Sequence, residues 1–172
     1  MTRSGLLGVL TLGVLFVGGC AKPEFKEFNS ATGRYKVQML GTPKEETKEA
    51  AGMTMNIASV QQRDGAFLVS WTDMPISGTE SPAELETRLD GSRDGSLGNI
   101  QAKLTKETKI KLNGKYPGRD IEADLPGGKG SLHFKVFIVG KRLYQVMSVG
   151  SSSWAKSADT TKFLDSFVLV EK

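Results

Sequence analysis

Apolar and polar side chains alternate along most of the chain after Arg34, and this pattern predicts β-strands. Successive side chains of a strand point to opposite faces, so alternation buries one face and leaves the other polar. We expect strands over residues 34–39, 53–61, 66–73, 102–112, 119–125, 132–139 and 142–149, and a short one over 168–170. The segment 132–139 is apolar on both faces, which predicts a strand covered on both sides.

Two segments have helical spacing instead. The first begins at Ser81, where a capping serine, Pro82 at the first helical position and Glu84 bonding back to the cap are typical of a helix start. Leu85 and Leu89 lie one turn apart on its expected buried side. We expect this helix to end near residue 97, because three glycines weaken its second half.

The second helix is predicted over residues 154–167. Its expected cap is Ser153, and its expected buried stripe comprises Thr160, Phe163, Leu164 and Phe167.

Short turns connect the predicted strands. Asp-Gly within 62–65 and Gly-Lys at 140–141 predict hairpins, and Tyr116–Arg119 (YPGR) predicts a type II turn. Residues 44–49 (KEETKE) are expected to be a solvated connection. In the 102–112 strand, Leu104, Ile110 and Leu112 are expected on one face. Strands joined by short turns predict an antiparallel sheet of about six to eight strands with helices packed on it, an α+β fold.

The first twenty residues have a different pattern. Arg3 precedes an uncharged run from Ser4 to Val17, followed by small residues and the only cysteine of the chain, which is the layout of an export signal. The motif Val17-Gly18-Gly19-Cys20 resembles the lipobox of bacterial lipoproteins, in which the thiol is acylated and the chain is cleaved between Gly19 and Cys20.

Two alternatives stay open for this segment. An ordinary signal peptide cleaved after Gly19 would leave a free thiol at Cys20. A transmembrane helix is disfavoured, because the apolar run from Leu6 to Val17 spans only about 18 Å of a hydrocarbon core roughly 30 Å thick.

The lipobox interpretation implies three regions. Residues 1–19 would be a cleaved lipoprotein signal peptide, 20–29 the lipidated cysteine (thioether lipid and palmitate) with a short tether, and 30–172 a single domain. Phe25 and Phe28 suggest that part of the tether docks onto the domain. The protein would then be exported and anchored in a membrane of the cell envelope, either inner or outer.

The composition bounds the size of the domain and excludes several kinds of binding site. Removing 19 of the 172 residues leaves 153, enough for one domain with a sizeable core, and a net charge of about +3, too low for a nucleic-acid binder. With Cys20 as the only cysteine and His133 as the only histidine, neither an internal disulfide nor a thiolate metal site can form. We expect no metal, no cofactor and no nucleic acid.

Three motifs suggest chemistry that the sequence only partly supports. Residues 90–101 have the oxygen spacing of a calcium loop, but Gln101 replaces the bidentate glutamate. Residues 127–131 (GGKGS) depart from the phosphate-binding loop at Gly130 and favour a hairpin loop. The serines at 151–153 lack the nucleophile elbow, and His133 has no acid placed beside it. We therefore expect no enzymatic activity.

The residues expected to line a binding cleft, if one exists, are Trp71, Asp73 and Trp154, although a core position is the favoured interpretation of Trp71. The lysines at 103, 109 and 111 are candidates for contact with lipid headgroups or an acidic partner. A plain solvated face is the favoured interpretation of these lysines.

Three motifs in the second half carry a family resemblance: residues 116–120 (YPGRD), 140–146 (GKRLYQV) and 163–167 (FLDSF). They resemble small exported proteins of the PsbP-like superfamily, and the element order matches from about Gly33 to Val170. The resemblance implies an antiparallel sheet sandwiched between helices. Members are mostly binding or assembly factors, such as the extrinsic PsbP subunit of photosystem II, and no catalytic residue set belongs to the fold.

The sequence therefore favours a membrane-anchored lipoprotein that binds a protein partner or supports assembly at the cell envelope. Its expected partners are the lipid bilayer, through Cys20, and an unidentified envelope protein. The alternative from a different class is a carrier of a small ligand or lipid with a pocket between sheet and helix.

Overall fold

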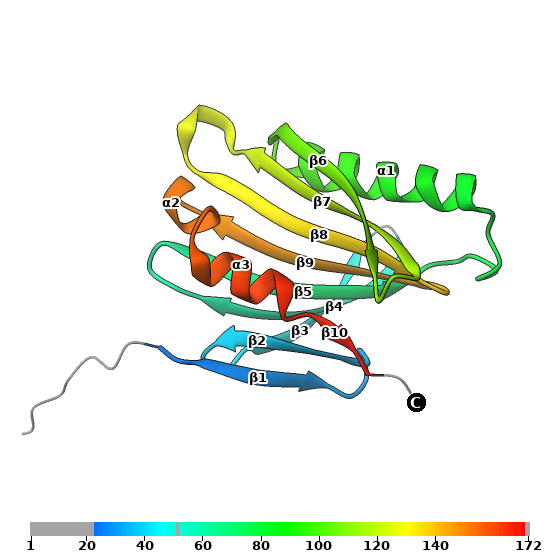
Figure 1. Ribbon diagram of the computed structural model, residues 1–172, viewed down its shortest axis with the longest axis horizontal. Coiled ribbons are helices and arrows are strands. Elements are labelled where there is room, and N and C mark those ends of the chain that lie inside the picture. The colour runs from blue at the N-terminus through cyan, green and yellow to red at the C-terminus, as the bar shows by residue number, and fades with distance from the viewer. Residues whose placement is uncertain (1–22, 51, 171–172) are drawn as a thin grey trace, which may run out of the picture.

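Two antiparallel sheets form the framework of the computed structural model, which describes residues 23–50 and 52–170 (Figure 1). The smaller sheet has the strand order β1-β2-β10. Its strands are β1 (Phe25–Ser30), β2 (Tyr35–Leu40) and the two-residue β10 (Val168–Leu169). The predicted signal peptide and Cys20 lie outside the described residues.

The larger sheet has seven strands in the order β3-β4-β5-β9-β8-β7-β6, and every neighbouring pair is antiparallel. Its strands are β3 (Lys44–Ala50), β4 (Met53–Gln61), β5 (Gly65–Asp73), β6 (Lys103–Leu112), β7 (Tyr116–Asp124), β8 (Ser131–Val139) and β9 (Arg142–Gly150). A short 3₁₀ helix, η1 (Pro126–Gly128), lies in the loop between β7 and β8.

The seven-stranded sheet is the middle layer of the domain. Helix α1 (Pro82–Asn99) packs on one face, against β7 and β8. The other face is covered by α2 (Ser152–Ala155), α3 (Ala158–Asp165) and the small sheet (Figure 1). The result is the expected α+β arrangement, with one cover made partly of strands.

An aromatic core fills the space under the small sheet and α3. The ring of Phe67 stacks on that of Phe163 with centroids 4.4 Å apart, and Tyr35 packs against Tyr144 and Phe167. Because Phe67 comes from β5, Tyr35 from β2 and Phe163 from α3, this core joins the two sheets to the helix.

A second core lies under α1. Leu89 and Leu97 pack on a face of β7 and β8 formed by Ile121, Ala123, Leu132, Phe134, Val136 and Ile138. On the opposite face of β8, Phe137 belongs to the aromatic core. The prediction that the 132–139 strand is covered on both sides is confirmed.

Most predicted strands and both predicted hairpins are confirmed, but the connection over residues 44–49 is wrong, since these residues form strand β3. Every one of its residues pairs with β4. A charged sequence suits this place because β3 is an edge of the sheet, where charged side chains oppose pairing with another chain.

The type II turn predicted at Tyr116–Arg119 is also wrong, because these residues begin strand β7. The chain turns earlier, at Asn113 and Gly114, which both have positive φ. Gly118 is needed within the strand, since a Cβ there would collide with the ring of Phe137.

The face predicted for Leu104 is wrong as well. A register shift between Leu104 and Lys106 places an extra residue in β6, so Leu104 opposes Ala123 while Ile110 opposes Gly118. A bulge of this kind reverses the sides of a strand from that point onward. Leu104 therefore lies on the face of β6 that carries Glu107 and Lys109, not on that of Ile110 and Leu112.

Helix α1 has the predicted capping box at Ser81 and extends to Asn99, two residues beyond the expected end. The predicted second helix is two helices, α2 and α3. Their N-caps are Ser151 and Ser157, so the prediction of Ser153 as the cap is wrong. The buried stripe of that segment is confirmed: Thr160, Phe163, Leu164 and Phe167 are all buried.

The described residues begin close to the first strand. Phe25 and Phe28, predicted within the tether, lie in β1 and pack against the aromatic core. Only residues 20–24 of the predicted tether precede this strand. Within residues 23–50 and 52–170, no helix has the length and apolar character needed to cross a membrane.

Candidate functional site

Trp71 and Asp73 lie at one end of β5, where they line a surface pocket of about 520 Å³ with Met53, Met74 and Pro75. Trp154 belongs to α2 and lies beside the other end of β5, over Gly65. It lines a different pocket of about 740 Å³. The structure thus brings Trp71 and Asp73 together and places Trp154 apart from them.

Trp154 has a packing role in this arrangement. Its ring lies 4.8 Å from that of Phe67 and directly over Gly65, where a Cβ would collide with the indole. The indole Nε1 is buried and has no hydrogen-bond partner among the described residues. The ring can approach this closely because glycine at position 65 has no side chain.

Trp71 and Asp73 hold the side chain of Arg142, which comes from the beginning of β9. The guanidinium lies 3.9 Å from the centre of the Trp71 ring. Its Nε and Nη2 donate to the two carboxylate oxygens of Asp73 at 2.6 and 2.9 Å, and Nη1 donates to the carbonyl of Thr32 at 2.9 Å. These contacts fix the orientation of the guanidinium plane.

Arg142 also lines a second cleft beside Asp73, which we call the basic cleft. Its volume is about 680 Å³, and its cationic side chains are Arg34, Lys115, Lys141 and Arg142. Its apolar wall is formed by Tyr116, Val139, Leu169 and Val170. Five separate parts of the chain meet here: the β1–β2, β6–β7 and β8–β9 turns and the ends of β5 and β10.

The cations of the basic cleft change the pKa of Asp73. Hydrogen bonding to Arg142 has the largest effect and lowers the pKa of this carboxyl. Burial opposes it, and the charges of Arg142 and Arg34 add to the lowering. Asp73 side-chain exposure is 60%, so the carboxylate stays accessible to solvent.

We expect the pKa of Asp73 in the folded protein to lie below its ordinary value of 3.8. A folded-state pKa that is depressed stabilises the fold above the unfolded-state pKa, and this contribution is lost as the pH falls through the lower folded-state value. NMR titration of the Asp73 carboxyl carbon measures the midpoint. In Arg142→Ala the midpoint should rise towards 3.8, and an unchanged midpoint would contradict the assigned cause.

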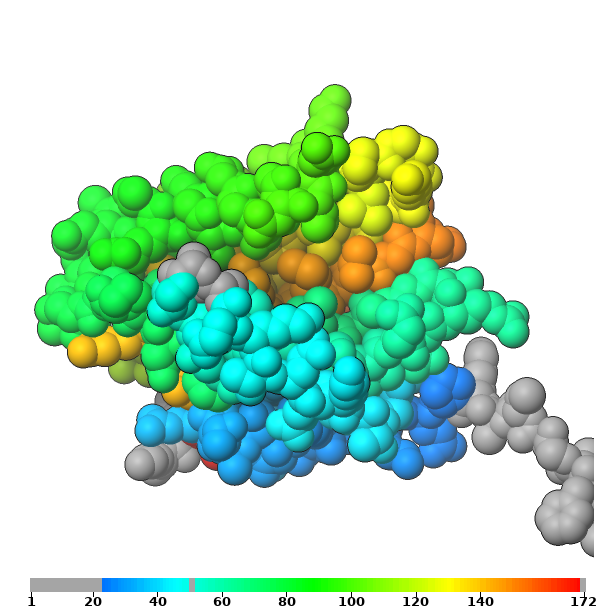
Figure 2. Space-filling view, turned by 180° about the vertical axis from the view of Figure 1, so that it is seen from behind, coloured from blue at the N-terminus to red at the C-terminus, as the bar shows by residue number. Residues whose placement is uncertain are grey.

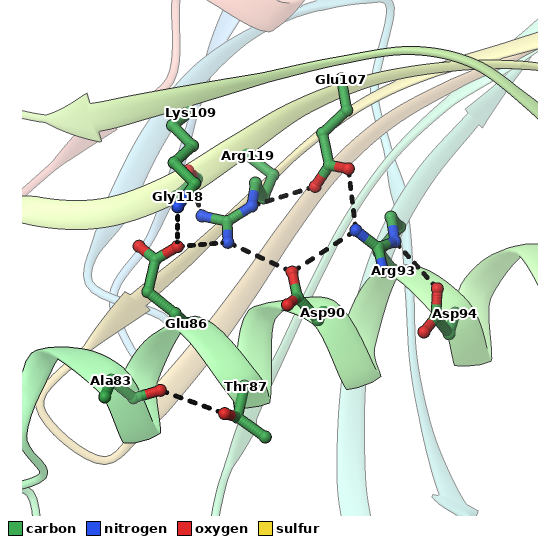
Figure 3. Close-up of polar contacts among 10 residues, drawn as sticks. All are labelled: Ala83, Glu86, Thr87, Asp90, Arg93, Asp94, Glu107, Lys109, Gly118 and Arg119. Atoms are coloured by element: carbon green, nitrogen blue, oxygen red, sulfur yellow. Dashed lines mark hydrogen bonds and ion pairs between the residues drawn. The ribbon is translucent and has the colours of Figure 1, made fainter.

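The opposite face of the sheet carries an ion network between α1 and strands β6 and β7 (Figure 3). Arg119, only 2% exposed, contacts Glu86 at 2.6 Å, Asp90 at 3.2 Å and Glu107 at 2.9 Å. Arg93 extends the network to Asp90, Asp94 and Glu107. The four carboxylates face three cations, including Lys109, so the network is nearly balanced in charge.

The pKa values in this network have identifiable causes. Hydrogen bonds from Arg119 and Lys109 lower the pKa of Glu86. For Arg119, burial lowers the pKa, but the bonds and charges of Glu86 and Asp90 outweigh it and raise the pKa above its ordinary value. Glu86 and Arg119 therefore stay charged near neutral pH, and their ion pair joins α1 to the sheet.

The calcium-loop alternative over residues 90–101 is wrong, because residues 90–99 continue helix α1. Their carboxylates point to arginines, as Asp90 and Asp94 both contact Arg93. One of the three candidate lysines, Lys109, also belongs to this network through Glu86 at 2.6 Å. The GGKGS segment is a hairpin loop between β7 and β8, as expected.

His133 has an acid beside it that the sequence did not suggest. Its Nε2 lies 2.7 Å from Asp120 on the neighbouring strand β7. The nearby hydroxyl of Ser131 donates to Asp124 at 2.9 Å and lies 3.2 Å from the hydroxyl of Ser152. Among the described residues no serine hydroxyl is hydrogen-bonded to His133, so the dyad and the serines form separate groups.

Comparison with known proteins identifies the fold. The solution structure of cyanobacterial PsbP (CyanoP) from Synechocystis sp. PCC 6803 superposes with a TM-score of 0.58 at 17% sequence identity, over 88% of this chain and 96% of that one. A crystal structure of a Pseudomonas aeruginosa protein of unknown function superposes at 0.40, with 8% identity over 76% of this chain and 85% of that one, which is too low to support an inference. No protein-family model and no curated protein matches the chain.

The domain therefore has a PsbP-like fold, in agreement with the family resemblance of its second half. At this level of identity the similarity identifies the fold alone. The chemistry of the site must come from the residues of this chain.

Proposed function

We propose that the protein is a membrane-anchored, non-enzymatic lipoprotein whose domain binds a protein partner or supports assembly at the cell envelope. The anchor would be lipid on Cys20, which lies outside the described residues. The basic cleft is the observation that carries the binding role, because it combines concave shape, excess positive charge and an apolar wall. The motif Val17-Gly18-Gly19-Cys20 supports the anchor.

The position of the basic cleft suits an anchored protein. The pocket at the Gly65 end of β5 is lined by Pro23, so the chain enters the domain there. The basic cleft includes Asp73, at the other end of β5, about 27 Å away at the rise of an antiparallel strand.

The segment between Cys20 and the domain is short compared with the length of β5. Pro23 lies three positions after Cys20, a reach of about 11 Å at most. A lipid on Cys20 would keep the end of the domain that carries Pro23 close to the bilayer. The basic cleft would then lie on the far side of the domain, where a partner can reach it.

Metabolic labelling with a fatty acid, followed by capture from detergent-solubilised membranes, tests the proposal. The wild-type chain is expected to carry label, to remain in the membrane fraction and to recover one partner in stoichiometric amount. Cys20→Ala is expected to be unlabelled and released into the soluble fraction, because multiple acyl chains make dissociation slow. An unlabelled wild type with a free thiol would contradict the anchor.

The capture step has a matched pair of variants. The double variant Lys115→Glu/Lys141→Glu reverses two charges of the basic cleft and is expected to lose the partner. Lys26→Glu/Lys103→Glu makes the same charge change on exposed residues of β1 and β6 outside that cleft and should keep it. Equal recovery with both double variants would contradict the assigned surface.

The second candidate function is a carrier of a small ligand or lipid. One observation favours it, which is that α1 covers only part of its face of the sheet. Figure 2 shows a recess between α1 (green) and strands β3 and β4 (cyan), with β9 (orange) inside it. Ile57, Leu68 and Met147 lie on this face and are half-buried. Native mass spectrometry would reveal a bound ligand if the recess holds one.

A further inference from the structure

Arg142 is the cation of the basic cleft that is best prepared to receive an anion. A guanidinium presents a planar pair of donors that matches the two oxygens of a carboxylate. Stacking on Trp71 at 3.9 Å and the bond to the Thr32 carbonyl hold this plane in place before any ligand arrives. A guanidinium that is already oriented loses little side-chain entropy on binding.

The present occupant of this donor pair is Asp73. It accepts from Nε and Nη2 of Arg142, yet its side-chain exposure is 60% against 17% for Arg142. Two hydrogen bonds hold this carboxylate, but solvent reaches it, and water screens the attraction between exposed charges. Asp73 therefore occupies a carboxylate position that another carboxylate can take.

The surrounding charge favours such an exchange. Asp73 is the single carboxylate among the described residues that line the basic cleft, and three further cations, Arg34, Lys115 and Lys141, are exposed around it. An incoming acidic group meets an excess of positive charge, which raises both the affinity and the rate of association.

The apolar wall limits the kind of ligand. Val139, Leu169 and Val170 lie beside the cations, and the main chain of Val170 is paired with that of Arg34. The cleft is open, with Gly140 and Val170 exposed at its surface. An open cleft with a charged side and an apolar side fits an extended chain segment that carries acidic and apolar residues.

We propose that the basic cleft binds an acidic segment of the envelope partner, one carboxylate of which displaces Asp73 from Arg142 while a neighbouring apolar side chain packs on Val139 and Leu169. Asp73 acts as an internal competitor that keeps Arg142 oriented in the free protein. This inference rests on the proposed function, of which it names the recognition chemistry.

The test measures binding of a fluorescein-labelled, end-capped peptide of glutamate and leucine to the full processed chain in neutral detergent, by fluorescence anisotropy at low salt. Asp73→Asn is expected to bind about fivefold more tightly, because it removes a competing charge worth about 1 kcal/mol at 4 Å in water. Arg142→Gln is expected to weaken binding at least about tenfold.

A further cleft variant and three controls accompany these variants. Lys115→Gln/Lys141→Gln should weaken binding without disturbing the fold, since both side chains are exposed, and Lys26→Gln should have no effect. The peptide with glutamine in place of glutamate should not bind. Inorganic phosphate should compete only at concentrations far above those of the peptide.

Equal binding of the glutamate and glutamine peptides, or unchanged or weaker binding by Asp73→Asn, would overturn the proposal. Competition by phosphate at the peptide's own concentration would also overturn it, in favour of a phosphate site. The proposed function fails separately: an unlabelled Cys20 with normal peptide binding contradicts only the anchor. A captured partner without peptide binding contradicts only the assignment of the cleft.

Discussion

Replacing Arg119 with alanine is expected to lower the free energy of unfolding by about 3–5 kcal/mol, the usual cost of removing one partner from a buried ion pair. Arg119 is 2% exposed, and removing its side chain leaves Glu107 and Glu86 without their inner cation. The remaining carboxylates would repel one another between α1 and the sheet. Urea unfolding followed by circular dichroism measures the change.

Lys109→Ala is the matched control for this prediction. Lys109 contacts the same carboxylate, Glu86, at the same distance of 2.6 Å, but its side chain is 73% exposed. An exposed ion pair contributes about 1 kcal/mol or less, so this variant should unfold almost as the wild type does. Comparable losses in the two variants would show that burial does not set the strength of the network.

Phe67→Ala is expected to cost about 3–5 kcal/mol, as is typical when a large buried aromatic side chain is removed and the cavity persists. Phe67 is fully buried on β5, and its ring stacks on Phe163 and lies 4.8 Å from Trp154. The cavity cannot close easily, because these neighbours are held by α2 and α3. Thermal and urea unfolding give the magnitude.

Val168→Ala provides the comparison for the aromatic core. Val168 is 45% exposed in the edge strand β10, so its truncation should change the free energy of unfolding by less than about 1 kcal/mol. A small loss in Phe67→Ala, close to that of Val168→Ala, would mean that the layers repack around the missing ring and that the stacked aromatics are not essential.

Elements set by local pattern could be predicted. The capping box at Ser81 and the Asp-Gly hairpin depend on residues close in sequence, and both occur where expected. The stripe through Phe163 and Leu164 is buried as predicted, although the helix that carries it is divided. Local chemistry is sufficient in these cases because capping bonds and turn geometry need no distant partner.

Elements set by their neighbours could not be predicted in the same way. Residues 44–49 are charged except for Thr47, and they form a strand only because β4 supplies their hydrogen-bond partners. The bulge near Thr105, which turns Leu104 to the other face, also depends on pairing with β7. Arg119 has no feature in the sequence that distinguishes it from an exposed arginine.

The sequence by itself determined the order of most strands and of helix α1, the PsbP-like character of the second half and the presence of one cysteine after small residues. Only the tertiary structure decided which charged groups meet. Arg142 reaches Asp73 across 69 positions, and the basic cleft joins three turns and the ends of two strands from distant parts of the chain. Sites of this kind arise from strand pairing between distant segments, so periodicity along the chain carries no record of them.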